Sequence, residues 1–172
     1  MSWADWSVPP TRPVVALAAG VAAALTIATL LTLHNVTDWK WLIPSFGASC
    51  ALVFGVPDSP FARPASVIGG HLVSSAAGLV VMAVLGHGPA AMAIGVGAAI
   101  AAMLISGTMH PPAGGDPLIV IAVSATPMFL LTPVLVGTAA IAAGGKLFRW
   151  FAPYRAARRR ARLNDTGANV VK

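Results

Sequence analysis

Four long apolar stretches constrain this chain more than any other feature of its sequence. They are Val14 to Leu33, Ser66 to Leu85, Ala90 to Ser106 and Phe129 to Phe148. A helix needs about 20 apolar residues to cross a bilayer, and every backbone amide in lipid must find a partner within the protein. The sequence therefore predicts four transmembrane helices.

The composition agrees with lipid as the solvent. Hydrophobic residues make up 57% of the 172 positions and charged residues only 9%, and the mean hydropathy is +0.80. Soluble domains usually carry about 25% charged residues, so this chain has too few polar side chains to cover a water-soluble globule. Its single cysteine, Cys50, excludes an intramolecular disulfide.

Basic residues gather at the carboxyl end, where eight of the eleven follow from Lys146 onwards. A basic segment directly after a span usually lies in the cytoplasm, against anionic headgroups. Arg12, just before the first span, indicates the same side for the amino terminus. We divide the chain into a cytoplasmic segment 1–13, a transmembrane domain 14–150 and a basic cytoplasmic tail 151–172. We expect no nucleic-acid partner for this tail.

Two shorter apolar segments, Trp41 to Val56 and Pro117 to Ala125, lie between the spans. Each follows an opening rich in proline and glycine, and each precedes a full span, so the chain reads as two internal repeats. Interrupted helices in matching positions are typical of transport sites. The predicted fold is an all-α membrane protein with four transmembrane helices and two short re-entrant or broken helices. Six full crossings are the alternative, but the second segment is too short to cross.

The most distinctive motif is the run from His110 to Asp116, His-Pro-Pro-Ala-Gly-Gly-Asp. Three other motifs precede it in order: Pro44 to Ser49, Val56 to Pro60 and Val67 to His71. In these motifs the sequence resembles the HPP family of integral membrane proteins, over roughly Leu42 to Gly137. Asp116 departs from the family pattern, in which the residue after the glycines is usually small or neutral.

The resemblance implies a membrane channel or transporter. The family is described as having four membrane-spanning helices, and its plant members are implicated in nitrite transport across the chloroplast envelope. For this chain it implies a multi-pass protein of the bacterial inner (plasma) membrane that passes a small inorganic anion, with nitrite as the first candidate.

The openings of the two short helices are the expected site for that anion. Helix N-termini present unpaired N–H groups and partial positive charge, and glycine lets a ligand approach the backbone closely. Histidines at membrane depth can donate to an anion or pass a proton. The candidate substrate-binding residues are Ser45, Phe46, Gly47, Ala48, Ser49, His71, His110, Pro111, Pro112, Gly114, Gly115 and Asp116.

Each polar candidate also has a purely structural interpretation. His71 or His110 could be a neutral ring that only bonds a backbone carbonyl. Asp116 could cap its helix, or it could pair with either histidine as a proton relay.

Two other classes of function stay open. One is an intramembrane enzyme or metal-binding protein that uses His71, His110 and Asp116; the other is a small scaffold subunit. We expect no enzyme activity, metal or cofactor, because the sequence has no catalytic or metal-ligand motif of recognised spacing. The expected partners are the anion, membrane lipid and further copies of this chain, since four spans make a thin wall.

Overall fold

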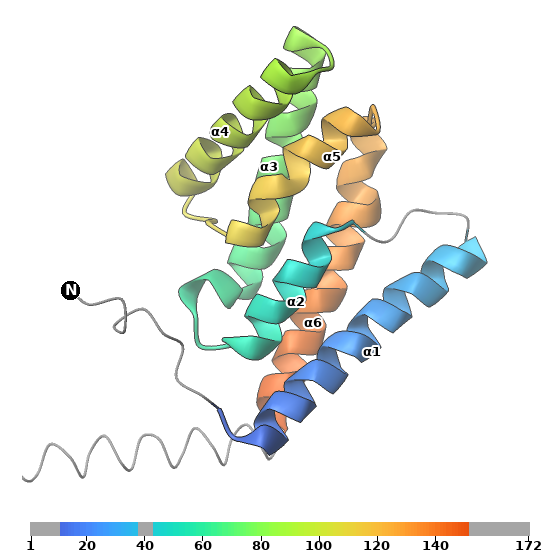
Figure 1. Ribbon diagram of the computed structural model, residues 1–172, viewed down its shortest axis with the longest axis vertical. Coiled ribbons are helices and arrows are strands. Elements are labelled where there is room, and N and C mark those ends of the chain that lie inside the picture. Colours follow the sequence, from blue (N-terminus) through green and yellow to red (C-terminus); the bar gives the residue numbers. More distant parts are fainter. Residues whose placement is uncertain (1–10, 38–42, 152–172) are drawn as a thin grey trace, which may run out of the picture.

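The computed structural model describes residues 11–37 and 43–151, and within these ranges every regular element is a helix (Figure 1). The longer helices are α1 (Pro13–Thr37), α3 (Pro64–Leu85), α4 (Pro89–Ile105) and α6 (Val136–Trp150); the shorter ones are α2 (Ser45–Gly55) and α5 (Asp116–Ala122). Between them lie 3-10 turns at Pro60–Ala62 (η2), Pro111–Gly115 (η3) and Pro127–Leu130 (η4), and a π-helical turn at Leu131–Leu135 (η5). The all-helical prediction is confirmed for these residues. Most of the predicted terminal segments, 1–13 and 151–172, lies outside them.

Prolines set where the long helices begin. Pro13, Pro64 and Pro89 are the first residues of α1, α3 and α4. Proline suits this position because the N–H that it lacks is one that a helix leaves unpaired anyway. Between α3 and α4, Gly86 and Gly88 adopt φ angles of 73° and 139°. Glycine reaches these angles without a Cβ clash, so the two helices form a tight hairpin.

Three helical stretches are long and apolar enough to cross a membrane: Pro13–Leu33, Pro64–Leu85 and Pro127–Trp150. They correspond to the first, second and fourth predicted spans. The third predicted span is α4, an apolar helix of 17 residues. At about 1.5 Å per residue it rises about 26 Å, against a hydrocarbon core of about 30 Å. The chain is therefore a multi-pass membrane protein. Its described residues contain three helices long enough to cross a membrane and two shorter apolar helices, α2 and α4.

The fourth span is not the single regular helix that the sequence predicts. The chain passes through η4 and η5 before α6 begins at Val136. Within η5, Thr132 has extended φ and ψ angles of −133° and 121°. The cause is Pro133, whose ring disfavours the helical conformation in the residue before it.

The second short helix ends earlier than the predicted Ala125. It begins at Asp116 and ends at Ala122. Two residues later, Ser124 has a positive φ of 49°, which a continuing right-handed helix cannot contain. The segment is thus even less able to cross a bilayer than its apolar length suggests.

The two short helices lead in opposite directions from the middle of the molecule (Figure 1). α2 runs towards the end where α1 begins and α6 ends, whereas α5 runs towards the α3–α4 hairpin. α3 contacts α4, α5 and α6, and α1 lies along one edge against α2 and α6. The first and last described helices therefore place their outer ends at the same end of the protein.

Glycines let the short helices approach the long ones. A Cβ added to Gly70 of α3 would lie 2.6 Å from His110 Cβ, and one added to Gly78 would lie 2.9 Å from Pro117 Cα. On α6, a Cβ at Gly137 would collide with the ring of Phe46 of α2. These glycines thus let the short helices pack closely against α3 and α6, in the way that small residues let membrane helices meet.

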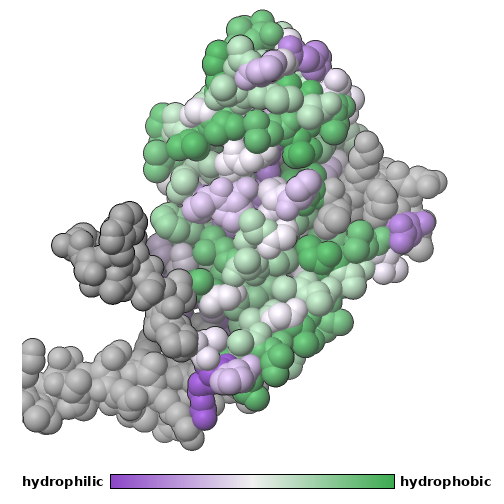
Figure 2. Space-filling model, in the orientation of Figure 1, coloured by the Kyte–Doolittle hydropathy of each residue, from purple (hydrophilic) through white to green (hydrophobic). Residues whose placement is uncertain are grey.

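The face of the protein seen in Figure 2 is largely apolar over the described residues. Val84 and Ile105, for example, are 76% and 88% exposed. Soluble monomers rarely expose contiguous apolar patches of more than a few hundred Å². A lipid environment accounts for such a surface, which agrees with the membrane spans.

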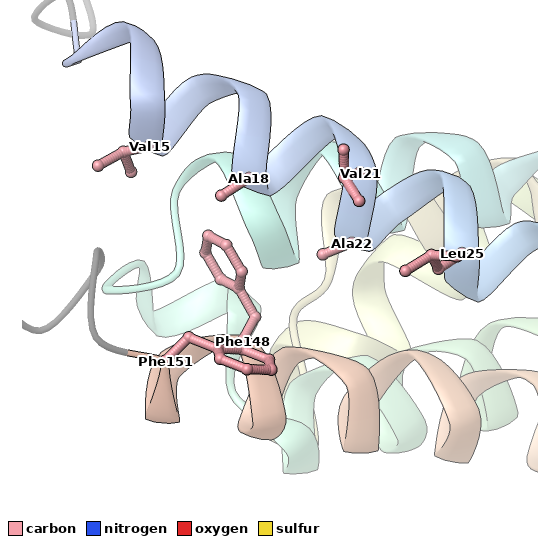
Figure 3. A pocket seen from close by; sticks show the side chains of 7 residues that line it. All are labelled: Val15, Ala18, Val21, Ala22, Leu25, Phe148 and Phe151. Carbon is pink, nitrogen blue, oxygen red and sulfur yellow. The ribbon is translucent and has the colours of Figure 1, made fainter.

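An apolar groove of about 280 Å³ lies between α1 and α6 (Figure 3). Its walls carry no polar side chain, so it offers nothing that would bind a small anion. The groove is lined by Val15, Ala18, Val21, Ala22, Leu25, Phe148 and Phe151.

Candidate functional site

The N-termini of the two short helices meet inside the protein. Ser45, the first residue of α2, donates its hydroxyl hydrogen to Asp116 Oδ1 across 2.7 Å. Asp116 is the first residue of α5 and its side chain is fully buried. A carboxylate of the chain itself therefore occupies the position next to both helix openings, where the electrostatics favour negative charge.

Two side chains of α3 also hold Asp116. His71 Nδ1 lies 2.7 Å from Asp116 Oδ2, and both side chains are completely buried. Ser75 donates to the same oxygen across 3.2 Å. A buried carboxylate is costly unless it is paired and hydrogen-bonded. Contacts from Ser45, His71 and Ser75 explain how the acid is accommodated here.

The hydroxyl of Ser49 lies between two imidazole rings. Its Oγ is 2.8 Å from His71 Nε2 and 3.0 Å from His110 Nε2. It also lies 3.1 Å from the carbonyl oxygen of Ser45, one turn earlier in α2. The ring centroids of the two histidines are 5.1 Å apart. One hydroxyl of α2 thus links a histidine of α3 to the histidine of the HPP motif.

The second nitrogen of His110 faces a backbone carbonyl. His110 Nδ1 lies 2.8 Å from the oxygen of Phe61, in the 3-10 turn η2. A carbonyl oxygen only accepts, so Nδ1 carries a proton. His110 thus makes the backbone-carbonyl contact that is expected of a purely structural histidine. Its Nε2 atom, however, also belongs to the series of hydrogen-bonded side chains that includes Ser49. We call the whole arrangement the polar cluster; it consists of Ser45, Ser49, His71, Ser75, His110 and Asp116.

The remaining predicted site residues surround the polar cluster without joining it. Phe46 is buried and packs edge-on against His71, with ring centroids 5.5 Å apart. Several others lie on more accessible backbone around the two openings. Gly47, Ala48 and Pro111 are exposed, and Pro112, Gly114 and Gly115 are half-buried.

Backbone N–H groups at both openings already have partners within the chain. Phe46 N donates to the Ile43 carbonyl at 3.0 Å, and Ala113 N donates to the His110 carbonyl at 2.9 Å. A bound anion would have to compete with these carbonyls. The N–H groups of Phe46 and Ala113 are therefore not the free donors that the sequence-based picture of bare helix ends assumes.

Open space remains beside the openings. A Cβ added to Gly47, Gly114 or Gly115 would meet no atom within 4 Å. Packing within the described residues therefore does not require glycine at these three positions. A small ligand could approach the backbone there, which is what the glycine-rich openings suggested.

Ser75 and the carbonyl of Phe61 are not among the residues that the sequence indicated. Ser75 follows His71 by four residues and so lies on the same face of α3, a spacing that could have revealed it. Ser74, next to it, donates to the Ala113 carbonyl across 2.6 Å and ties η3 to α3. Nothing in the sequence pointed to Phe61, because its contribution is a main-chain atom brought close by the fold.

No group of three or more His, Cys, Asp or Glu side chains in residues 11–37 and 43–151 could hold a metal ion. The polar cluster itself contains two histidines, one carboxylate and three serine hydroxyls. These groups can exchange protons and donate hydrogen bonds.

Fold and site together define a multi-pass helical membrane protein that encloses a polar cluster between two broken helices. Residues 8–157 match the family described as HPP, transmembrane region. The chain belongs to the HPP transmembrane family, which confirms the resemblance seen in its motifs.

Two curated relatives come from Dictyostelium discoideum, and both are described as transmembrane proteins. One is 38% identical over 107 residues, which cover 58% of this chain and 34% of the relative. The other is 40% identical over 82 residues, which cover 45% of this chain and 29% of the relative. The chain spans about a third of the length of these relatives. No solved structure matches it.

Proposed function

We propose that this protein is a membrane channel or transporter for a small inorganic anion, with nitrite as the first candidate. The observation that carries the proposal is the contact between Ser45 and Asp116, 2.7 Å long. It joins the openings of two broken helices inside an apolar bundle. Irregular backbone at membrane depth persists only where protein buries it or where it lines a cavity, and in transporters such helix breaks surround the substrate.

The element order supports two inverted repeats. A longer helix, a short helix, a 3-10 turn and another longer helix follow one another as α1, α2, η2 and α3. The same order returns from α4 to α6, with η3 added before α5 and η5 added after η4. The two short helices lead to opposite ends (Figure 1), as inverted repeats require. In this proposal α4 crosses as the fourth span, and both termini lie in the cytoplasm of a bacterial inner membrane.

The anion would approach between the exposed opening of α2 and the half-buried glycines of η3. In this proposal the anion lies on the His110 side of the polar cluster, and the carboxylate of Asp116 does not repel it strongly while His71 balances the charge of that carboxylate. In this proposal several copies assemble in the membrane, because each protomer provides only a thin wall.

Flux into vesicles tests the proposal. Purified protein is reconstituted into liposomes, and the uptake of nitrite, nitrate, formate and chloride is compared with that of empty liposomes. We expect nitrite uptake above the empty-vesicle rate. If none of the four anions enters faster than it enters empty vesicles, the proposal is wrong.

A second function has one specific observation in its favour. Three side chains of the polar cluster have the arrangement of a Ser-His-Asp triad. His71 Nε2 lies 2.8 Å from Ser49 Oγ, and His71 Nδ1 lies 2.7 Å from Asp116 Oδ2. Such a triad activates serine as a nucleophile. All three side chains are fully buried and His110 shares the same hydroxyl, so we favour transport. A fluorophosphonate probe separates the two, because a covalent adduct at Ser49 would support the enzyme.

A further inference from the structure

We infer that the polar cluster carries one mobile proton, which passes between His71 and His110 through the hydroxyl of Ser49 and couples anion movement to proton movement. The inference deepens the proposed function and rests on it for the anion. The presence of the proton itself follows from the geometry of the cluster.

The contacts of Ser49 require this proton, because they outnumber the hydrogens that the serine hydroxyl can supply. Ser49 has one hydroxyl hydrogen, yet its Oγ lies within 3.1 Å of three potential acceptors, namely the Ser45 carbonyl and the Nε2 atoms of His71 and His110. If both rings were neutral with their hydrogen on Nδ1, the single hydroxyl hydrogen could serve only one of these three contacts. In the other two, a lone pair of Ser49 Oγ would face a lone pair of the acceptor. At least one Nε2 must therefore carry a hydrogen and donate to Ser49 Oγ.

Charge assigns the hydrogen to His71. Nδ1 of His110 already donates to the Phe61 carbonyl, so a hydrogen on its Nε2 would make an imidazolium without an adjacent anion. His71 instead contacts Asp116 across 2.7 Å. An imidazolium at His71 and a carboxylate at Asp116 have no net charge, which lowers the cost of burying them in a low-dielectric interior. The hydroxyls of Ser45 and Ser75 further stabilise the ionised carboxylate.

The transfer needs only two short steps that occur together. His71 Nε2 gives its proton to Ser49 Oγ, and Ser49 gives its own hydrogen to His110 Nε2. Afterwards His71 is neutral with its hydrogen on Nδ1, Ser49 is again a hydroxyl, and His110 is an imidazolium. An anion beside His110 stabilises this second state, so anion binding and proton transfer favour each other.

Few other titratable groups surround the cluster. Cys50 follows Ser49 on α2 and is buried, Arg63 is exposed at the start of α3, and α4 has no titratable side chain. Lys146 and Arg149 lie towards the carboxyl end of α6. The proton that the count requires therefore belongs to His71, His110 and Asp116.

Coupling is measured in liposomes that hold purified protein, a pH dye and a potassium concentration clamped with valinomycin. A nitrite gradient is applied in mildly alkaline buffer, and empty liposomes correct for passive entry of the neutral acid. We expect nitrite uptake to acidify the lumen one proton per anion, at a rate independent of membrane potential. Nitrite uptake that follows the potential without acidification would overturn the inference and leave the proposed function intact. Acidification that is independent of nitrite would also overturn the inference, because the proton would then move without the anion.

Ser49→Ala removes the bridging hydroxyl and should lower coupled uptake about 100-fold, the usual scale for losing a positioned proton-transfer group. Ser49→Thr keeps a hydroxyl and should restore part of the rate. Thr138→Val is the matched control, because it removes a buried hydroxyl that bonds only carbonyls within its own chain segment. Nitrogen-15 NMR of the wild-type protein in lipid supplies a readout that needs no flux. We expect both nitrogens of His71 and only Nδ1 of His110 to be protonated, and two neutral rings would contradict the inference.

Discussion

At the residue scale, the central feature is a carboxylate that has found its partners among residues far away in the sequence. Asp116, His71 and Ser49 come from three different helices and form one continuous hydrogen-bonded chain. The sequence identified all three as candidates, since polar groups at membrane depth are functional by default. It left open whether Asp116 caps a helix or pairs with a histidine. Only tertiary packing decides which polar groups meet.

Asp116→Asn tests how much this pairing stabilises the fold. The amide keeps the size of the side chain but removes the charge opposite His71. Breaking one partner of a buried pair typically costs about 3–5 kcal/mol, so the apparent melting temperature in detergent should fall markedly. Ser75→Ala, which removes one hydroxyl from the same carboxylate, should cost only about 1 kcal/mol. Equal effects of the two variants would contradict a charged pair between Asp116 and His71.

At the element scale, the apolar runs and the prolines located most helices within a few residues. They could not reveal that the fourth span breaks at Thr132, or that Ser124 ends α5 with a positive φ. Both features are local backbone conformations that hydropathy does not record. Gly70, Ser74 and Gly78 recur at a spacing of four residues in the sequence, but the sequence does not show what this stripe of small residues packs against. In the folded protein, Gly70 packs against Thr108 and His110, at the start of the HPP motif, and Gly78 packs against Pro117 and Val120 of α5.

Gly70→Ala tests the close contact between α3 and the start of the HPP motif. A Cβ there would lie 2.6 Å from His110 Cβ and 2.8 Å from the Thr108 carbonyl oxygen. The segment from Thr108 to His110 must therefore shift away from α3. Overpacking of this kind costs about 1–3 kcal/mol. Gly97→Ala on α4 is the control, because its Cβ would meet nothing within 4 Å and alanine favours helix by about 1 kcal/mol. Thermal unfolding in detergent should show a loss for the first variant only, and a stable Gly70→Ala protein would argue against the close contact.

At the scale of the whole molecule, the described helices place the beginning of α1 and the end of α6 at one end (Figure 1). The charge pattern of the sequence predicted a common side for both termini. The membrane class and the family follow from hydropathy and motifs, whereas the contacts inside the polar cluster depend on how the helices pack. The opposite directions of the two short helices become visible only in the folded protein (Figure 1).

Cysteine labelling tests the topology. Cys50 is buried, with 2% of its surface exposed, so it should not react in intact protein. Single cysteines are introduced at Arg12, His87 and Phe151, and sealed membrane vesicles are treated with an impermeant maleimide. Arg12→Cys and Phe151→Cys should react from the cytoplasmic side, and His87→Cys, in the α3–α4 turn, from the opposite side. Labelling of all three from one side would contradict a crossing α3.

The most direct test of the account compares nitrite uptake by His110→Ala and His87→Ala in liposomes. His110 belongs to the polar cluster, whereas His87 lies in the α3–α4 turn and contacts only the Ile121 carbonyl among its described hydrogen bonds. The account predicts that His110→Ala loses most of the uptake and that His87→Ala keeps the wild-type rate. Unchanged uptake by folded His110→Ala protein would contradict the claim that the polar cluster carries the function.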